Sequence, residues 1–371
     1  MFARSVNPSA EKGPVQVAPH THQGVTKLTT VTPDDDEPKQ NTNLKWGLAA
    51  VTVLAIVSTV VAVVLLFGGG DSAKEPSASP TKSSPSPASA VASASDNGPV
   101  AVITEDPSCA AWTSINNALA TDGEGIWNDR DRSVPAGQWN PKQRAQFTAA
   151  AQSLRSAAAQ SVGLAKLTPH RVMRELYEQF IAYARAYAQR IPNYTPADDT
   201  LAGTANSASS ALGAICAAIS DGSAAARGPM VPPQAAPTQT APPGNPANPQ
   251  PFLSSANPVC GDWKSALDQF GTQTAAWQQM DPNIPSMLWN QEQRATNYAA
   301  APVMNTLANR LDQLGRRSGN PILQDFATLS AQYRRAFVLA VPSYSPPDNH
   351  LANAANYIST TVLGACAAVR A

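Results

Sequence analysis

The sequence has few of the residues with which enzymes carry out chemistry. Its 371 residues include four histidines and four cysteines, and the formal net charge is zero. It contains no HExxH, no CxxC and no glycine-rich phosphate loop, the short motifs that predict a zinc, redox or nucleotide site. No strongly basic segment predicts binding to nucleic acid. The composition therefore favours a protein that is not an enzyme and needs no cofactor or metal.

Most of the rare residues occur at matched positions, because one module is present twice. Residues 109–219 align with 260–369 at an offset of 151, which becomes 150 after a slip of one residue. All four cysteines and six of the seven tryptophans are paired in this way. Self-similarity at a fixed period indicates duplicated structure. We therefore expect one fold built twice.

One long apolar run predicts a membrane anchor. Trp46–Phe67 comprises 22 residues without a charge, and a helix needs about 20 to cross the hydrocarbon core. A cleaved signal peptide fits less well, because the run is too long and starts about 45 residues into the chain. The sequence therefore predicts contact with a lipid bilayer through Trp46–Phe67.

Composition divides the chain into six segments. Stretches rich in Ser, Pro and Ala predict flexible spacers on both sides of the first module. Such spacers would hold the two modules away from the membrane and let them move independently. The predicted segments are a disordered cytoplasmic tail (1–44), a transmembrane helix (45–67), a stalk (68–107), helical module 1 (108–220), a Pro-rich linker (221–257) and helical module 2 (258–371).

Each module is predicted to be a four-helix bundle, so the expected fold class is all-α. Asn140 and Asn290 each precede a Gln at the third helical position, a variant of the capping box. The segments 195–198 and 345–348 are start signals for the fourth helix. Apolar residues follow them with 4-3-4-3-4 spacing, which is typical of a helix packed in a bundle.

The cysteines fit this topology. In an up-down-up-down bundle the first helix begins where the fourth ends. Cys109 and Cys216 occupy these two points in the first copy, and Cys260 and Cys366 occupy them in the second. Of the three possible connectivities, the two disulfides within the repeats suit this geometry. Disulfides persist in oxidising compartments, so we expect the N-terminus in the cytoplasm and both modules outside the plasma membrane.

The histidines do not suggest a catalytic or metal site. His170 and His350 are each matched by a different residue type in the other copy. Glu175 and Glu178 lie close to His170 in the sequence, and the three residues could be drawn as a metal site. We favour the simpler interpretation, a solvated face at the start of the third helix.

One loop in each module, 122–139 and 273–289, carries the matched features that have no evident structural role. Tryptophans there could stack on sugars or anchor a partner protein. Alternatively, they fill the end of the bundle, which is the interpretation that we favour for most of them. The candidate binding residues are Trp127, Asp131, Trp139, Trp277, Asp281 and Trp289.

The N-terminal tail carries threonines ahead of an acidic run. Thr29, Thr30 and Thr32 precede residues 34–37, all of which are acidic. A phosphate on one of them could be read by an arginine-lined pocket, so a kinase or a phosphothreonine reader is a candidate partner. The alternative is an ordinary acidic, Thr-rich disordered stretch.

The order of tail, anchor, stalk and disulfide-bonded helical module resembles uncharacterised single-pass membrane proteins of actinobacterial cell envelopes. The resemblance implies a location at the envelope, and a tail of a kind that Thr kinases often modify. We therefore predict a non-enzymatic membrane-anchored protein whose two modules bind a partner protein or an envelope component such as a glycan. The alternative is a transmembrane signalling or regulatory subunit that acts through its phosphorylatable tail.

Overall fold

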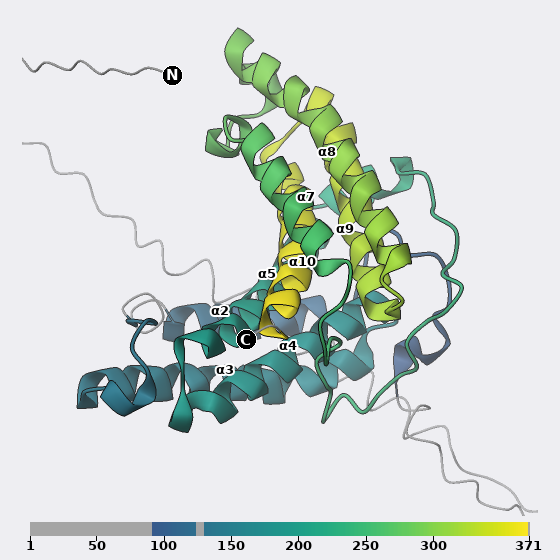
Figure 1. Cartoon of the computed structure of the whole chain (residues 1–371). Coiled ribbons are helices and arrows are strands. Elements are labelled where there is room, and N and C mark those ends of the chain that lie inside the picture. Colours follow the sequence, from purple (N-terminus) through teal and green to yellow (C-terminus); the bar gives the residue numbers. More distant parts are fainter. Residues whose placement is uncertain (1–90, 124–129, 370–371) are drawn as a thin grey trace, which may run out of the picture. The chain divides into compact units, whose positions relative to one another are not determined.

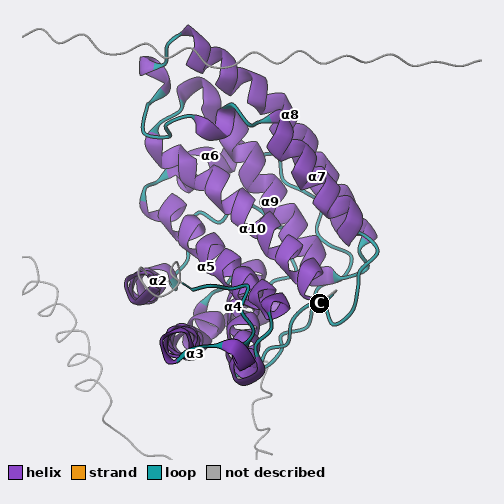
Figure 2. Cartoon of the chain, turned by 60° about the vertical axis from the view of Figure 1, so that its left-hand side comes forward, coloured by secondary structure: helices purple, strands orange, loops and turns teal. Residues whose placement is uncertain are grey.

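The computed structural model describes residues 91–123 and 130–369. All regular structure in these two ranges is helical, as the all-α prediction requires (Figure 2). None of the helices in these ranges combines the length and apolar character needed to cross a bilayer. The predicted anchor Trp46–Phe67, the candidate phosphosites Thr29, Thr30 and Thr32, and Trp127 lie outside the described residues.

Each repeat contains four long helices in which each helix packs against the next and the first also contacts the fourth. The shorter segments between them are mostly single 3-10 turns. The long helices are α2 Cys109–Gly123, α3 Pro141–Leu167, α4 Arg171–Arg190 and α5 Asp199–Ser220 in repeat 1, and α7 Cys260–Gln273, α8 Gln291–Arg317, α9 Pro321–Ala340 and α10 Asn349–Ala368 in repeat 2. The short ones are η3 Ala92–Ser95, η4 Ala136–Gln138, η5 Ile191–Asn193, η6 Pro196–Asp198, α6 Ser223–Arg227, η7 Gly228–Met230, η8 Trp277–Gln279, η9 Ser286–Leu288, η10 Val341–Ser343 and η11 Pro346–Asp348.

The helix starts have the hydrogen bonds that the sequence pattern predicts. The Asn140 side chain accepts from the backbone N–H of Gln143 at 2.8 Å, and the Gln143 side chain accepts from the backbone N–H of Asn140 at 3.0 Å. Asn290 caps α8 in the same way. Asp198 and Asp348 close the equivalent boxes ahead of α5 and α10. These caps satisfy backbone N–H groups that the first turn of a helix leaves without partners.

One disulfide joins the first and last helices of each repeat. Cys109 bonds to Cys216 and Cys260 bonds to Cys366, which is the pairing within the repeats. Each bond closes a loop of more than a hundred residues. In the chain-entropy account, such a constraint on the unfolded chain contributes about 4–5 kcal/mol to the free energy of unfolding.

The two repeats pack against each other, so the expectation that they move independently is wrong. The described residues belong to one compact unit. Its most extensive helix–helix contact is between the equivalent helices α5 and α10, and α4 also contacts α9 (Figure 1). α4 packs on α3, α5 and α9, and sixteen of its twenty residues are buried.

The segments ahead of each repeat also contact the opposite repeat. Ile103 precedes α2 and contacts Tyr333 in α9. Its backbone N–H donates to the Tyr333 hydroxyl, and its C=O accepts from the same hydroxyl, each at 3.3 Å. In return, Phe252, which precedes α7, donates its N–H to the side chain of Gln179 in α4 at 2.9 Å. Phe252 and Leu253 are buried. The predicted linker is therefore held against α4 at Phe252 by a specific hydrogen bond.

The close approach of α5 and α10 predicts opposite effects for two glycine substitutions. A Cβ on Gly364 would contact the Thr204 hydroxyl and lie 3.3 Å from the Thr204 Cα. We expect Gly364→Ala to lower the free energy of unfolding by roughly 1–3 kcal/mol through overpacking. Chemical denaturation of the full-length chain measures this change.

Gly213→Ala in α5 is the matched control. The nearest atom to its new Cβ is Asn116 Nδ2 at 3.4 Å, and Ala is favoured over Gly in a helix by up to about 1 kcal/mol. We therefore expect this variant to be as stable as the parent or slightly more stable. Equal stabilisation by both substitutions would contradict the described packing of α5 on α10.

Candidate functional site

The loop predicted to bind in repeat 2 forms one wall of a cavity. Trp277, Asp281 and Trp289 all line a cavity of about 490 Å³, within the range of about 300–1,000 Å³ that small-molecule sites usually have. Residues of α7, α9 and α10 form the other walls. The structure therefore brings the three described candidates of this loop together around one space.

The path of this loop is fixed by the residues that follow α9. The Tyr344 hydroxyl donates to the carbonyl of Pro282 at 2.6 Å, and the carbonyl of Tyr344 accepts from the N–H of Ser286 at 2.9 Å. Trp289 donates its indole N–H to the carbonyl of Ile284 at 2.9 Å. The cavity is thus built on a loop tied to the helical scaffold.

The two matched loop aspartates close turns. Asp281 accepts from the backbone N–H and the side-chain amide of Asn283, both at 2.9 Å. Asp131 accepts from the hydroxyl of Ser133 at 2.6 Å and from its backbone N–H at 3.0 Å. The Ser133 hydroxyl, and next its N–H, lower the pKa of the Asp131 carboxyl. This turn-closing contact gives both residues the structural role that the sequence did not reveal.

Trp139 and Trp289 fill the bundle ends. Trp139 stacks on Phe147 with ring centroids 4.2 Å apart, and the Arg144 guanidinium lies 5.9 Å from the Trp139 ring. Trp289 stacks on Tyr344 at 5.5 Å. Each tryptophan is 7% exposed. Their main role in the structure is therefore packing, with one edge of Trp289 reaching the cavity.

Trp277 is more exposed than Trp139 and Trp289 and also lines the cavity. Its indole N–H donates to Asn297 at 3.2 Å, and its ring meets Phe337 edge-on at 5.6 Å. These two contacts set the orientation of a half-buried aromatic surface. Such a surface can stack against a ligand ring, because stacking needs an exposed face held in one orientation.

Arg334 of α9, which the sequence patterns did not single out, is the cation of this cavity. Its side chain lines the cavity although the residue is 3% exposed. The guanidinium lies 4.8 Å from the Phe270 ring centroid, and one amino group donates to the Ser359 hydroxyl at 3.5 Å. No described carboxylate forms an ion pair with it, and its Nε has no hydrogen-bond partner there. Burial lowers the pKa of Arg334 to about 10, so the group is charged at neutral pH.

The equivalent region of repeat 1 holds an arginine together with its own carboxylate. Arg130 pairs with Asp199 at 3.5 Å and lies over the rings of Phe147 and Tyr187. At an offset of 150, Arg130 and Asp199 correspond to Met280 and Asn349, and Phe147 and Tyr187 correspond to Asn297 and Phe337. All four of these repeat 2 residues line its cavity. The matched positions therefore carry an internal ion pair in repeat 1 and border open space in repeat 2.

A row of amides on α10 completes the cavity. Asn349, Asn353 and Asn356 all line it and follow helical spacing, which places them on one face. No residue in the described ranges hydrogen-bonds their side chains. Each amide offers both donors and an acceptor, so this wall can bond hydroxyl or amide groups of a ligand.

A second polar cluster, at the contact between the repeats, corrects one prediction. Glu175 and Glu178 are 0% and 7% exposed and are not on a solvated face. They lie 3.6 Å and 3.8 Å from the guanidinium of the buried Arg174. No group of metal-binding side chains is found in the part of the chain that the structure describes.

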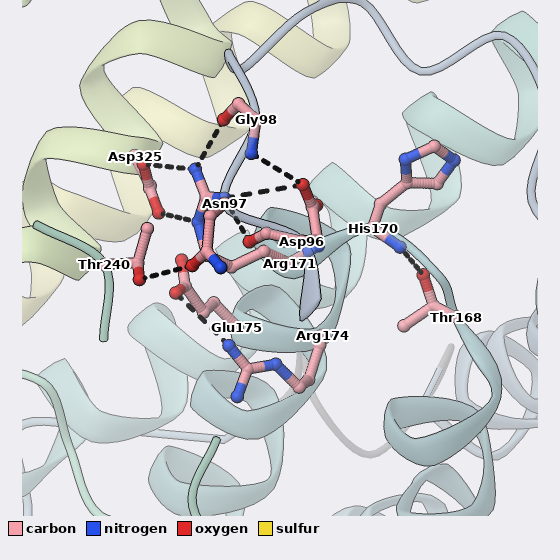
Figure 3. A network of polar contacts seen from close by, with 10 residues as sticks. All are labelled: Asp96, Asn97, Gly98, Thr168, His170, Arg171, Arg174, Glu175, Thr240 and Asp325. Carbon is pink, nitrogen blue, oxygen red and sulfur yellow. Dashed lines mark hydrogen bonds and ion pairs between the residues drawn. The ribbon is translucent and has the colours of Figure 1, made fainter. Parts of the chain in front are cut away.

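Figure 3 shows how this cluster links the repeats. Arg171 of α4 makes a bidentate pair with Asp325 of α9, at 2.7 Å and 3.2 Å, and also bonds the backbone carbonyl of Asp96 at 2.5 Å. Asp325 is the matched position of Glu175, at an offset of 150. Burial, and next the nearby Asp325, raise the pKa of Glu175 well above its usual range.

Comparison with known proteins places the chain in a family. The model for mycobacterial ESX-1 associated proteins matches residues 91–370. The chain belongs to this family, and the match covers both repeats. It is similar to an uncharacterised protein of Mycolicibacterium smegmatis (strain MKD8), with 49% identity over 337 residues, 91% of this chain and 89% of that protein. No solved structure matches the chain.

The raised pKa of Glu175 predicts a pH dependence of stability. A carboxyl that binds its proton more tightly in the folded chain makes the free energy of unfolding fall as pH rises above the unfolded pKa of about 4.3. Glu175→Gln removes this titration. We therefore expect the variant to gain stability relative to the parent between about pH 5 and pH 8, by on the order of 1 kcal/mol or more.

Urea unfolding at several pH values measures the gain. Glu292→Gln makes the same Glu-to-Gln change at an exposed site in the first turn of α8, outside the cluster, and is the control. A difference between Glu175→Gln and the parent that stays constant with pH would show that folding does not raise the pKa of Glu175.

Proposed function

We propose that this chain is a non-enzymatic, membrane-anchored binding protein with a secretion-related role. Repeat 2 would hold a group of a partner or envelope component in the cavity beside the 273–289 loop. The observation that carries the proposal is the buried Arg334 in that cavity, next to the aromatic ring of Trp277 and the amides of α10. Buried charges are normally paired, so an unpaired one beside open space favours a binding site.

Family membership supports the secretion-related part of the proposal. The family is described as ESX-1 associated, and the matched region contains the whole cavity. The polar groups of the cavity also suit binding better than catalysis. The Tyr344 hydroxyl is held by Pro282, and Asp281 is held by its own turn. These groups shape the wall and are not poised to move a proton.

The anchoring part rests on the sequence. The apolar run Trp46–Phe67 would fix the chain in the membrane, with the disulfide-bonded repeats in the oxidising space outside. Met287 and Leu288 are 83% and 70% exposed next to Trp289. They would offer apolar contact to a partner too large for the cavity itself.

The proposal predicts that a crosslinker in repeat 2 captures a ligand or partner that the same crosslinker in repeat 1 does not. A photoreactive amino acid replaces Asn353, which lines the cavity, in the full-length chain in its own membrane. The matched control replaces Gly203 of repeat 1. We expect a specific adduct from position 353 and none from position 203, detected by gel shift and mass spectrometry.

Trp277→Ala in the same chain tests whether the cavity is responsible. Loss of the ring should reduce the adduct at least several-fold while thermal unfolding shows that the chain is still folded. Identical adducts from positions 353 and 203, or an adduct that Trp277→Ala leaves unchanged, would contradict binding in this cavity.

A further inference from the structure

We infer that the cavity of repeat 2 binds a sugar acid, a hydroxyl-rich ring that carries one carboxylate, and that this carboxylate pairs with Arg334. The inference rests on the proposed function, because it identifies the ligand class of the same cavity. It follows from three features of the described residues. Arg334 is a buried cation without a counter-ion, repeat 1 contains an arginine that is paired with a carboxylate of the same repeat, and amides and an aromatic ring line the cavity.

The unpaired cation needs an anion. Moving a guanidinium out of water is costly unless a carboxylate or phosphate takes over its hydration. Among the described residues Arg334 has one hydrogen bond, at 3.5 Å to a hydroxyl, and contact with the Phe270 ring. Neither contact neutralises the charge. A bound anion would supply the partner that the described part of the chain does not.

Repeat 1 indicates which anion. There, Arg130 meets the carboxylate of Asp199. Repeat 2 has Asn349 in place of that aspartate and Arg334 where repeat 1 has Ala184. The second repeat therefore has an arginine on α9 and an amide where the first repeat has the acid. A carboxylate from outside the chain would restore the pair that the first repeat contains.

The charge of the cavity favours one carboxylate over a phosphate. Arg334 is the one basic residue among those that line it, and Asp281 stands at its exposed edge. Phosphate monoesters carry close to two negative charges at neutral pH. One buried guanidinium balances one carboxylate, whereas a phosphate would leave excess charge next to Asp281.

The remaining walls fit hydroxyl groups. Asn349, Asn353 and Asn356 offer paired donors and acceptors on one helix face, and the Thr360 hydroxyl lies one turn further along. Trp277 provides an aromatic surface held by Asn297 and Phe337. Amides and an aromatic ring that line one cavity suit a flat ring that is polar at its edge and apolar on its face. A sugar ring has this character.

Binding of glucuronate and glucose to the full-length chain tests the inference. The two probes share a ring and differ in one group, a carboxylate in place of a hydroxymethyl. We expect glucuronate to bind at least about tenfold more tightly, because hydrogen bonds to a charged group add that much or more. Isothermal titration or ligand-observed NMR measures both affinities.

Three variants assign the effect to the cavity. Arg334→Ala introduces the residue that repeat 1 has at this position and should remove the preference for glucuronate. Asn349→Asp restores the carboxylate of repeat 1 and should weaken glucuronate at least about tenfold by repulsion or by pairing with Arg334. Lys264→Ala removes an exposed positive charge of the same repeat, outside the cavity, and should leave both affinities unchanged.

Different results would overturn the sugar-acid assignment and the proposed binding function. Equal binding of the two sugars, no binding of either at millimolar concentration, or an unchanged preference in Arg334→Ala would overturn the sugar-acid assignment. If a peptide with a free carboxyl terminus displaced the crosslinked adduct of position 353 and glucuronate did not, the assignment would fall while the binding function stood. Absence of any cavity-dependent adduct would overturn the proposed function itself.

Discussion

The buried pair between Arg171 and Asp325 joins the two copies of a duplicated fold into one body. Each partner is almost completely buried, and the bond crosses from α4 to α9. A charge enclosed in this way is strongly destabilising when its partner is removed, so the two repeats depend on each other. The close contact of α5 with α10 and the reciprocal seating of the segments ahead of each repeat follow from the same arrangement.

The two repeats share one scaffold and differ beside the tryptophan loop. The disulfides, the capping boxes of α3 and α8, and the stacked Trp139 and Trp289 recur in the two repeats. The region next to the tryptophan loop is different, because repeat 1 contains an internal ion pair there and repeat 2 contains Arg334 beside a cavity. In this account, the first copy is mainly structural and the second copy carries the binding site.

Matched positions predicted the all-α class, the helix starts and the cysteine pairs, because these features depend on local chemistry and on spacing along the chain. They did not predict that Glu175 and Glu178 are buried, since one polar helix face looks solvated until a second repeat covers it. The matched positions also did not predict a role for Arg334, because repeat 1 has no arginine at that position. Its signal in the sequence was a departure from the repeat, an arginine matched by Ala184 and an asparagine matched by Asp199.

The central claim is that the second repeat uses Arg334 to hold a carboxylate. The most direct measurement is the NMR signal of the Arg334 guanidinium in the full-length chain with labelled arginine, assigned by its absence from Arg334→Ala. The account predicts that the guanidinium N–H signals of Arg334 shift when glucuronate is added and do not change with glucose. A signal that is unaffected by glucuronate at saturating concentration would contradict it.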